Sequence, residues 1–203
     1  CWLLSGFVFF AFLNKKKIDQ QLMPWVIIVT SVTLGFFILM VVFFENPFLR
    51  FFLDFNGDVY KAIIQPAATI QARPDYGMGM NPLLYHLGMV FHPPMLYLGF
   101  VGFVVPFGYA IAALVTGRED DLWIRNSQKW ALASWLFLTI GLVLGSRWAY
   151  DVLGWGGYWG WDPVEVSALM PWLTSTAYLH SSLVQEKRGI FKHWSAALII
   201  LTF

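Results

Sequence analysis

The chain is poor in charged residues and has a single cysteine. Of its 203 residues, 12% are charged and 58% are hydrophobic, and the mean hydropathy is +0.61. This balance lies outside that of soluble globular domains and predicts a membrane protein. Cys1 alone can form neither an internal disulfide nor a Cys-x-x-Cys pair, which excludes a thiol oxidoreductase and a zinc or iron–sulfur centre held by cysteines. Redox or metal chemistry must then use histidines or a bound cofactor.

Several common signatures are also missing. The net charge is +1, and no basic patch is interleaved with aromatic residues, so nucleic acid is not expected as a partner. The sequence contains no P-loop and no segment that resembles a Ser/His/Asp triad. The chemistry of the chain must therefore be sought in its aromatic residues and histidines.

Long apolar runs indicate membrane-spanning helices, because about 20 apolar residues cross a bilayer. Runs of this kind occupy 22–44, 93–115, 130–145 with its flanks, and 164–184, and shorter ones occupy 2–13 and 194–203. We therefore expect an all-α, polytopic transmembrane helix bundle of about six membrane segments, the first and last truncated, with an external tryptophan-rich loop. Residues 1–203 are expected to be a single fragment of a polytopic membrane domain, since no initiator Met precedes the first run.

Basic residues concentrate in loops that are expected on one side of the membrane. Nine of the 13 Lys and Arg residues fall within 14–21, 117–129 and 185–193, which the positive-inside rule places inside. The outer loop 45–81 and the tryptophan-rich segment 147–165 are then external. In the outer loop, 48–55 is typical of an interfacial anchor, and 59–72, which lies between turn signals, is expected to form a short surface helix.

The most informative segment is the tryptophan-rich one. In this segment glycines separate the residues that carry indole and phenol rings. This spacing favours a flat aromatic surface for a large planar ligand rather than an interdigitated apolar core. The alternative is an interfacial aromatic belt, but five of the eleven tryptophans fall between Trp148 and Trp172, whereas a belt would scatter them over both interfaces. The candidate ligand-binding residues are Trp155, Gly156, Gly157, Tyr158, Trp159, Trp161 and Asp162.

A helix is expected to follow this segment directly. Asp162 suits the N-cap position, Pro163 the first helical position, and Glu165 the position of a capping box. His180 lies 17 residues beyond Pro163, or about 26 Å along a helix. In a hydrocarbon core of about 30 Å, this depth puts His180 near the inner face of the membrane.

A second histidine is expected at the opposite, outer end of the membrane. His92 precedes Pro93, which suits the first turn of the helix 93–115. Because the two depths differ, His92 and His180 would serve two separate sites. The alternatives are a capping or headgroup role for His92 and a packing role for His180, while His86 is expected to be a surface or interfacial residue and His193 to be solvated or in contact with a lipid phosphate.

Residues 155–162 match the WGxxWxWD signature of the haem-handling membrane proteins of cytochrome c maturation. The continuations 162–173 and 179–181, and the upstream runs 81–84 and 91–99, resemble haem lyases of the CcmF or NrfE type more than the CcmC or CcsA types. The resemblance covers most of the chain from about residue 81 onward. One departure is Val166, where an Asn is common in the family.

The resemblance implies roles for both histidines. His92 would be the first of two external histidines that hold a haem iron against the tryptophan platform, and His180 the first of two membrane histidines that hold a haem b. The second histidine of each pair would lie beyond this chain, so the chain alone would be an incomplete haem lyase (cytochrome c synthetase) component. Asp162 would mainly fix the helix that follows it.

The resemblance also implies partners and a location. The partners would be haem, membrane lipid, a periplasmic haem chaperone, and apocytochrome c with its thiol-reducing and presenting subunits. The location would be the bacterial inner membrane with the tryptophan-rich loop on the periplasmic side, or alternatively the mitochondrial inner membrane. Two other functions remain open, a transporter of haem or another aromatic solute and a structural subunit of a membrane assembly complex. Haem spectra and dependence on apocytochrome would separate the three.

Overall fold

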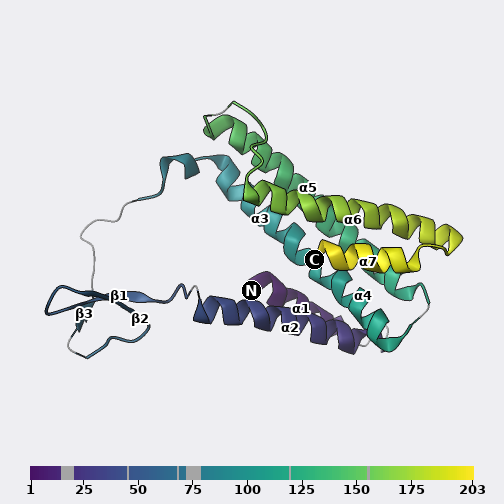
Figure 1. Ribbon diagram of the computed structural model, residues 1–203, viewed down its shortest axis with the longest axis horizontal. Coiled ribbons are helices and arrows are strands. Elements are labelled where there is room, and N and C mark those ends of the chain that lie inside the picture. Colours follow the sequence, from purple (N-terminus) through teal and green to yellow (C-terminus); the bar gives the residue numbers. More distant parts are fainter. Residues whose placement is uncertain (15–20, 45, 68, 72–78, 119, 155) are drawn as a thin grey trace. The chain divides into compact units, whose positions relative to one another are not determined.

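The computed structural model describes residues 1–14, 21–44, 46–67, 69–71, 79–118, 120–154 and 156–203. Helices dominate it (Figure 1), beginning with α1 (Trp2–Asn14) and α2 (Leu22–Phe43). Both follow the apolar runs expected from the sequence. Residues Cys1–Leu34 and Pro82–Phe203 form one compact unit, and Gly35–Asn81 forms another.

The third apolar run forms a broken helix that begins earlier than expected. It comprises α3 (Leu87–Gly102) and α4 (Val104–Thr116), which meet at Phe103. Pro106 lacks the N–H that would bond the Gly102 carbonyl, which accounts for the break. The expectation that Pro93 starts the helix is wrong: His86 caps it, its ring nitrogen accepting from the Gly88 N–H at 3.0 Å. His92 therefore lies within the helix, in its second turn.

The C-terminal half contains the longest helices, α5 (Leu122–Val152) and α6 (Pro163–Arg188), followed by α7 (Lys192–Thr202). These agree with the expected polytopic helix bundle. Within the described residues, three spans are long and apolar enough to cross a membrane, namely Leu22–Phe43, Leu87–Thr116 and Leu122–Val152. The α4–α5 and α6–α7 connections lie at one end of the bundle, where Gln185 donates to Asp121 at 3.1 Å.

Helices α3 and α5 pack in an antiparallel register set by glycines. A Cβ on Gly99 would lie 2.6 Å from the Leu138 backbone nitrogen, and one on Gly141 would lie 2.8 Å from the Leu96 nitrogen. Glycine on each helix thus faces a larger residue on the other, so the two backbones approach closely, as small residues allow in membranes. The same register brings Gly145 opposite His92.

Helices α5 and α6 are joined by side-chain hydrogen bonds. The Trp135 indole N–H donates to the Thr176 hydroxyl, and the Trp172 indole donates to Thr139, both at 2.8 Å. The two indoles stack with centroids 6.1 Å apart. Ser127 and Tyr178 share a further hydrogen bond of 2.6 Å. Such polar pairs stabilise helix association where lipid offers no hydrophobic driving force.

The second unit contains a small sheet rather than the expected surface helix. Strands β1 (Arg50–Asp54), β2 (Val59–Ala62) and β3 (Thr69–Gln71) form an antiparallel sheet in the order β2-β1-β3. The turn signal at Asn56 and Gly57 closes the β1–β2 hairpin, with Gly57 at φ +85°. The helix expected over 59–72 is wrong because this stretch is rich in β-branched residues and contains Pro66, which favour strands and loops.

Candidate functional site

His92 is held between α3 and α5 by contacts on two sides of its ring. Its Nδ1 lies 2.7 Å from the carbonyl oxygen of Gly141, and the ring meets the edge of Trp148 at a centroid distance of 5.8 Å. A Cβ on Gly145 would lie 2.5 Å from the ring carbon Cε1, so only glycine leaves room for the imidazole. With Nδ1 donating to the carbonyl, Nε2 carries the lone pair and makes no hydrogen bond among the described residues.

A polar cluster connects the start of α3 to the C-terminal end of α5. Asp151 lies 3.5 Å from Nε2 of His86 and accepts from Nε of Arg147 at 2.9 Å. Since Nδ1 of His86 already accepts from the helix backbone, a neutral His86 ring carries its proton on Nε2 and directs it at Asp151. The expectation that His86 is a surface residue omitted this capping and pairing role, which no local sequence pattern indicates.

Aromatic contacts connect the tryptophan-rich loop to the same turn of α5. Tyr158 stacks on Tyr150 with centroids 4.4 Å apart and planes inclined by 10°, and the Arg147 guanidinium lies 5.8 Å from the Tyr150 ring centroid. Trp159 and Trp161 meet edge to face at 5.7 Å. Of the candidate loop residues, Trp155 lies outside the described residues. The loop is thus connected, through Tyr150, Arg147 and Asp151, to the helix that carries His92.

The loop ends in the helix start expected from the sequence. Asp162 is the N-cap of α6 and accepts from the Glu165 N–H at 2.7 Å, and Pro163 occupies the first helical position. Glu165 reaches back beyond the cap and accepts from the Gly160 N–H at 2.7 Å. The cap therefore also fixes the backbone between Trp159 and Trp161.

Backbone strain and an unpaired donor mark the two tryptophans. Trp161 has φ +56°, the left-handed region that favours glycine, and is the one such non-glycine residue in the part of the chain that the structure describes. Gly156 at φ +69° needs its glycine for the same reason. The buried Nε1 of Trp159 has no hydrogen-bond partner among the described residues. A buried indole N–H without an acceptor is unfavourable and fits a site that receives a polar ligand.

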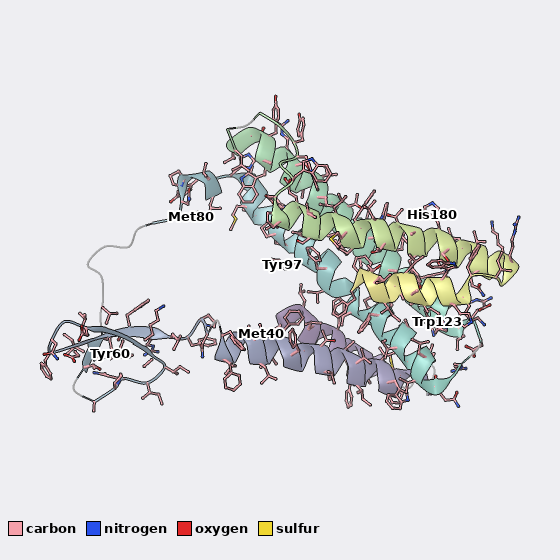
Figure 2. The ribbon with its side chains drawn as sticks, in the orientation of Figure 1. Met40, Tyr60, Met80, Tyr97, Trp123 and His180 are labelled. Carbon is pink, nitrogen blue, oxygen red and sulfur yellow. The ribbon has the colours of Figure 1, made fainter. Side chains whose placement is uncertain are left out.

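His180 lies on α6 with an exposed side chain (Figure 2). Its Nδ1 is 2.8 Å from the Thr176 carbonyl oxygen, one turn earlier in the same helix. The ring is therefore in the same state as that of His92, with Nδ1 on a backbone carbonyl and Nε2 left as the donor atom for a metal. This is the usual arrangement of metal-binding histidines.

The two histidines lie far apart along the bundle. His92 contacts Gly145 on α5, whereas Tyr178, two residues before His180, contacts Ser127. Eighteen residues of α5 separate Ser127 from Gly145, which corresponds to about 27 Å. The structure thus keeps the two histidines apart, and no group of three metal-ligating side chains occurs among the described residues. Each histidine can offer one nitrogen atom to a metal, and the described residues around it do not complete a metal centre.

These features define a polytopic helical membrane protein whose tryptophan-rich loop is connected by side-chain contacts to the helix that carries His92. The chain matches the family described as Cytochrome C assembly protein over residues 1–203, and it belongs to that family. It is 46% identical to the cytochrome c-type biogenesis protein CcmF of Haemophilus influenzae over 202 residues, which is 100% of this chain and 28% of that protein. The NrfE protein of the same organism is 41% identical over 194 residues, 96% of this chain and 27% of its own length.

A solved structure gives the same result. The chain is similar to a cytochrome c haem lyase CcmF, with a TM-score of 0.73 and 36% identity, over 99% of this chain and 28% of that one. CycK of Bradyrhizobium diazoefficiens, also a cytochrome c-type biogenesis protein, is 54% identical over 138 residues, 68% of this chain and 21% of that protein. The chain therefore matches between 21% and 28% of the length of these relatives.

Proposed function

We propose that this chain is the haem-binding part of a haem lyase for c-type cytochromes, which holds haem at an external tryptophan-rich platform and presents it to apocytochrome c. The observation that carries the proposal is the state of His92. Its Nδ1 is 2.7 Å from the Gly141 carbonyl, its ring is wedged against Gly145 and Trp148, and its Nε2 remains as a ligand atom. An imidazole fixed in this way is prepared to bind iron.

In the proposed site, the remaining candidate residues would surround that ligand. Trp155, Trp159 and Trp161 would stack on or flank the porphyrin, with Gly156, Gly157 and Tyr158 shaping the loop. Asp162 caps α6 and, with Glu165, fixes the loop backbone. The unpaired Trp159 N–H and the strained Trp161 backbone support a loop shaped for a ligand.

When bound, haem supplies vinyl groups, across which the thiols of a reduced Cys-x-x-Cys-His apocytochrome add to form thioethers. No side chain of this chain has to make or break a covalent bond in that addition. The chain's own contribution is to bind, orient and ligate. His180 would hold a separate haem b in the membrane through Nε2, since its Nδ1 is occupied by the Thr176 carbonyl.

The proposed setting is the bacterial inner membrane, with the tryptophan-rich loop on the periplasmic side. The concentration of basic residues at the opposite loops supports this orientation. The proposed partners are a periplasmic haem chaperone and apocytochrome c with its thiol-reducing and presenting subunits. The second axial histidine of each haem is expected in the part of the protein that this chain does not span.

Absorption spectra of the full-length protein that contains this chain test the proposal. Purified in mild detergent, it should show bis-histidine haem bands, and replacing His180 by Ala should remove the membrane haem while sparing the external one. Replacing His92 by Ala should do the reverse. A folded protein without haem would overturn the proposal. Haem flux into vesicles in the absence of apocytochrome would favour the transporter instead.

A further inference from the structure

A cavity lies at the end of the bundle opposite the tryptophan-rich loop. It has a volume of about 360 Å³ and is bounded by the C-terminal end of α4, the turn between α6 and α7, and the first turn of α7. This volume falls within the range of about 300–1,000 Å³ typical of small-molecule sites. The residues proposed to bind haem do not line it, so it is a different site.

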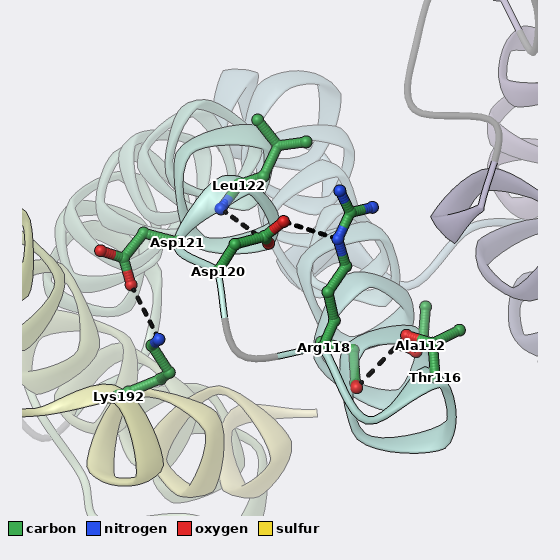
Figure 3. Close-up of polar contacts among 8 residues, drawn as sticks. Ala112, Thr116, Arg118, Asp120, Asp121, Leu122 and Lys192 are labelled. Atoms are coloured by element: carbon green, nitrogen blue, oxygen red, sulfur yellow. Dashed lines mark hydrogen bonds and ion pairs between the residues drawn. The ribbon is translucent and has the colours of Figure 1, made fainter.

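Three of the residues that line the cavity are basic. Arg118, Lys192 and His193 line it, and among the described residues no acidic side chain does. The nearest carboxylates hold the bases from outside the cavity: Asp120 accepts from Nε of Arg118 at 2.6 Å, and Asp121 lies 3.4 Å from Nζ of Lys192 (Figure 3). These contacts hold the Arg118 and Lys192 side chains beside the cavity that they line.

Most of the other residues that line the cavity are apolar, and they range from buried to exposed. Trp123 is 2% exposed and Ala113 is 5% exposed, whereas Leu114 and Ile190 are 57% and 63% exposed. Large apolar side chains this exposed near a helix end are suited to contact acyl chains. The lining of the cavity therefore combines basic residues with exposed apolar ones.

The position of the cavity across the membrane also favours contact with lipid. It lies where α4 ends at Thr116 and α7 begins at Lys192, so its basic residues are at the level where spanning helices leave the bilayer. Basic pockets between helix ends at this level recognise anionic headgroups, whose phosphate accepts hydrogen bonds from Arg and Lys. A soluble phosphate would contact the basic residues alone, and the exposed apolar residues that line the cavity would then have no partner.

We propose that this cavity binds an acidic phospholipid, with Arg118, Lys192 and His193 contacting the phosphate and Leu114 and Ile190 contacting an acyl chain. The inference is independent of the proposed haem function. It assigns a lipid site to the end of the bundle that carries no candidate haem ligand.

Native mass spectrometry of the full-length protein, released from nanodiscs of mixed phosphatidylglycerol and phosphatidylcholine, tests the site. We expect preferential retention of phosphatidylglycerol. Lys192→Gln and Arg118→Gln should each weaken that retention about fivefold, the effect of removing one charge at an anionic membrane surface. Lys192→Arg should restore it. The matched control is Arg125→Gln, because Arg125 pairs with Glu186 and does not line the cavity.

Two further experiments distinguish lipid binding from other causes of a change in lipid retention. Asp121→Asn breaks the same ion pair as Lys192→Gln but leaves the base in the cavity, so it should keep phosphatidylglycerol bound. If it instead lost as much phosphatidylglycerol as Lys192→Gln, the cause would be structural and the proposal would be overturned. Inorganic phosphate should not displace the lipid at equal concentration. Displacement, equal retention of both lipids, or an equal effect of Arg125→Gln would also overturn it.

Discussion

Nδ1 of His92 lies 2.7 Å from the carbonyl oxygen of Gly141, across the interface between α3 and α5. One turn further along α5, the imidazole ring packs directly on Gly145. Two glycines four residues apart therefore serve different purposes. Gly141 meets the backbone of α3 and sets the spacing of the helices, whereas Gly145 meets only the His92 ring and sets its orientation.

Replacing Gly145 by Ala should disturb His92 without disrupting the helix pair. The new Cβ would lie 2.5 Å from Cε1 of the ring, and a side-chain ring can rotate away, at the expense of its hydrogen bond to Gly141. We expect folding to be retained, the external haem bands to be weakened or shifted, and the membrane haem to be unchanged. Spectra at matched protein concentration measure this. Gly35→Ala, where the Cβ has open space, is the control and should change neither haem.

Replacing Gly141 by Ala should instead destabilise the bundle. Its Cβ would lie 2.8 Å from the Leu96 nitrogen and 2.9 Å from the Leu96 Cα, and the backbone of a packed helix cannot rotate away. Overpacking of this kind costs about 1–3 kcal/mol. Thermal unfolding in detergent should show a lower midpoint than for Gly145→Ala. If the two variants were equally stable, the distinction between them would be wrong.

The Trp135–Thr176 hydrogen bond should contribute measurably to the association of α5 with α6. A double-mutant cycle with Trp135→Phe and Thr176→Val removes the donor and the acceptor separately. We expect a coupling free energy of about 0.6 kcal/mol, the mean for such bonds in membrane helices. Unfolding free energies in detergent give this value. The Trp172–Thr139 pair, of the same length and chemistry, should give a similar result, and zero coupling in both cycles would contradict the prediction.

Local signals in the sequence predicted most of the helices and the cap at Asp162. The apolar runs matched α1, α2, α6 and α7 closely, whereas α5 extends the run 130–145 by eight residues at its start and seven at its end. Such agreement is expected because in a membrane length and hydropathy nearly suffice. Contacts between distant segments were not predictable. No local pattern pairs His86 with Asp151 or His92 with Gly145, since those contacts depend on the register of α3 against α5.

The remaining errors arose where local rules compete. Pro93 fits the first turn of a helix, but here a histidine cap seven residues upstream starts α3 and the helix continues through both prolines. In the second unit, strand pairing determined the structure of Val59–Ala62 and Thr69–Gln71, and the turn signal at Gly57 indicated this hairpin better than the length of the segment indicated a helix. The roles of the candidate haem residues stay predictions.

Replacing Glu165 by Ala should make the tryptophan-rich loop more mobile. Its carboxylate accepts from the Gly160 N–H at 2.7 Å, between Trp159 and Trp161. In Glu165→Ala this bond is lost, while Asp162 can still accept from the backbone N–H of residue 165. We expect faster proteolysis of the loop and weaker external haem binding, with the unfolding midpoint of the bundle changed little. Val164→Ala, an exposed neighbour in the same turn, is the control.

Two substitutions of Trp161, to Gly and to Ala, should differ in their effect on stability but cause the same loss of haem. At φ +56° an L-residue is strained by about 1–2 kcal/mol, which glycine avoids. Trp161→Gly should therefore be more stable than Trp161→Ala by about 1 kcal/mol, although Ala is the better residue in most other conformations. Both variants lack the indole, so both should lose external haem to the same extent. Unfolding midpoints and haem spectra of the two proteins test this directly. If the alanine variant were the more stable, the left-handed conformation would not be the one that the loop adopts. If only one variant lost haem, the indole would not be the group that holds it.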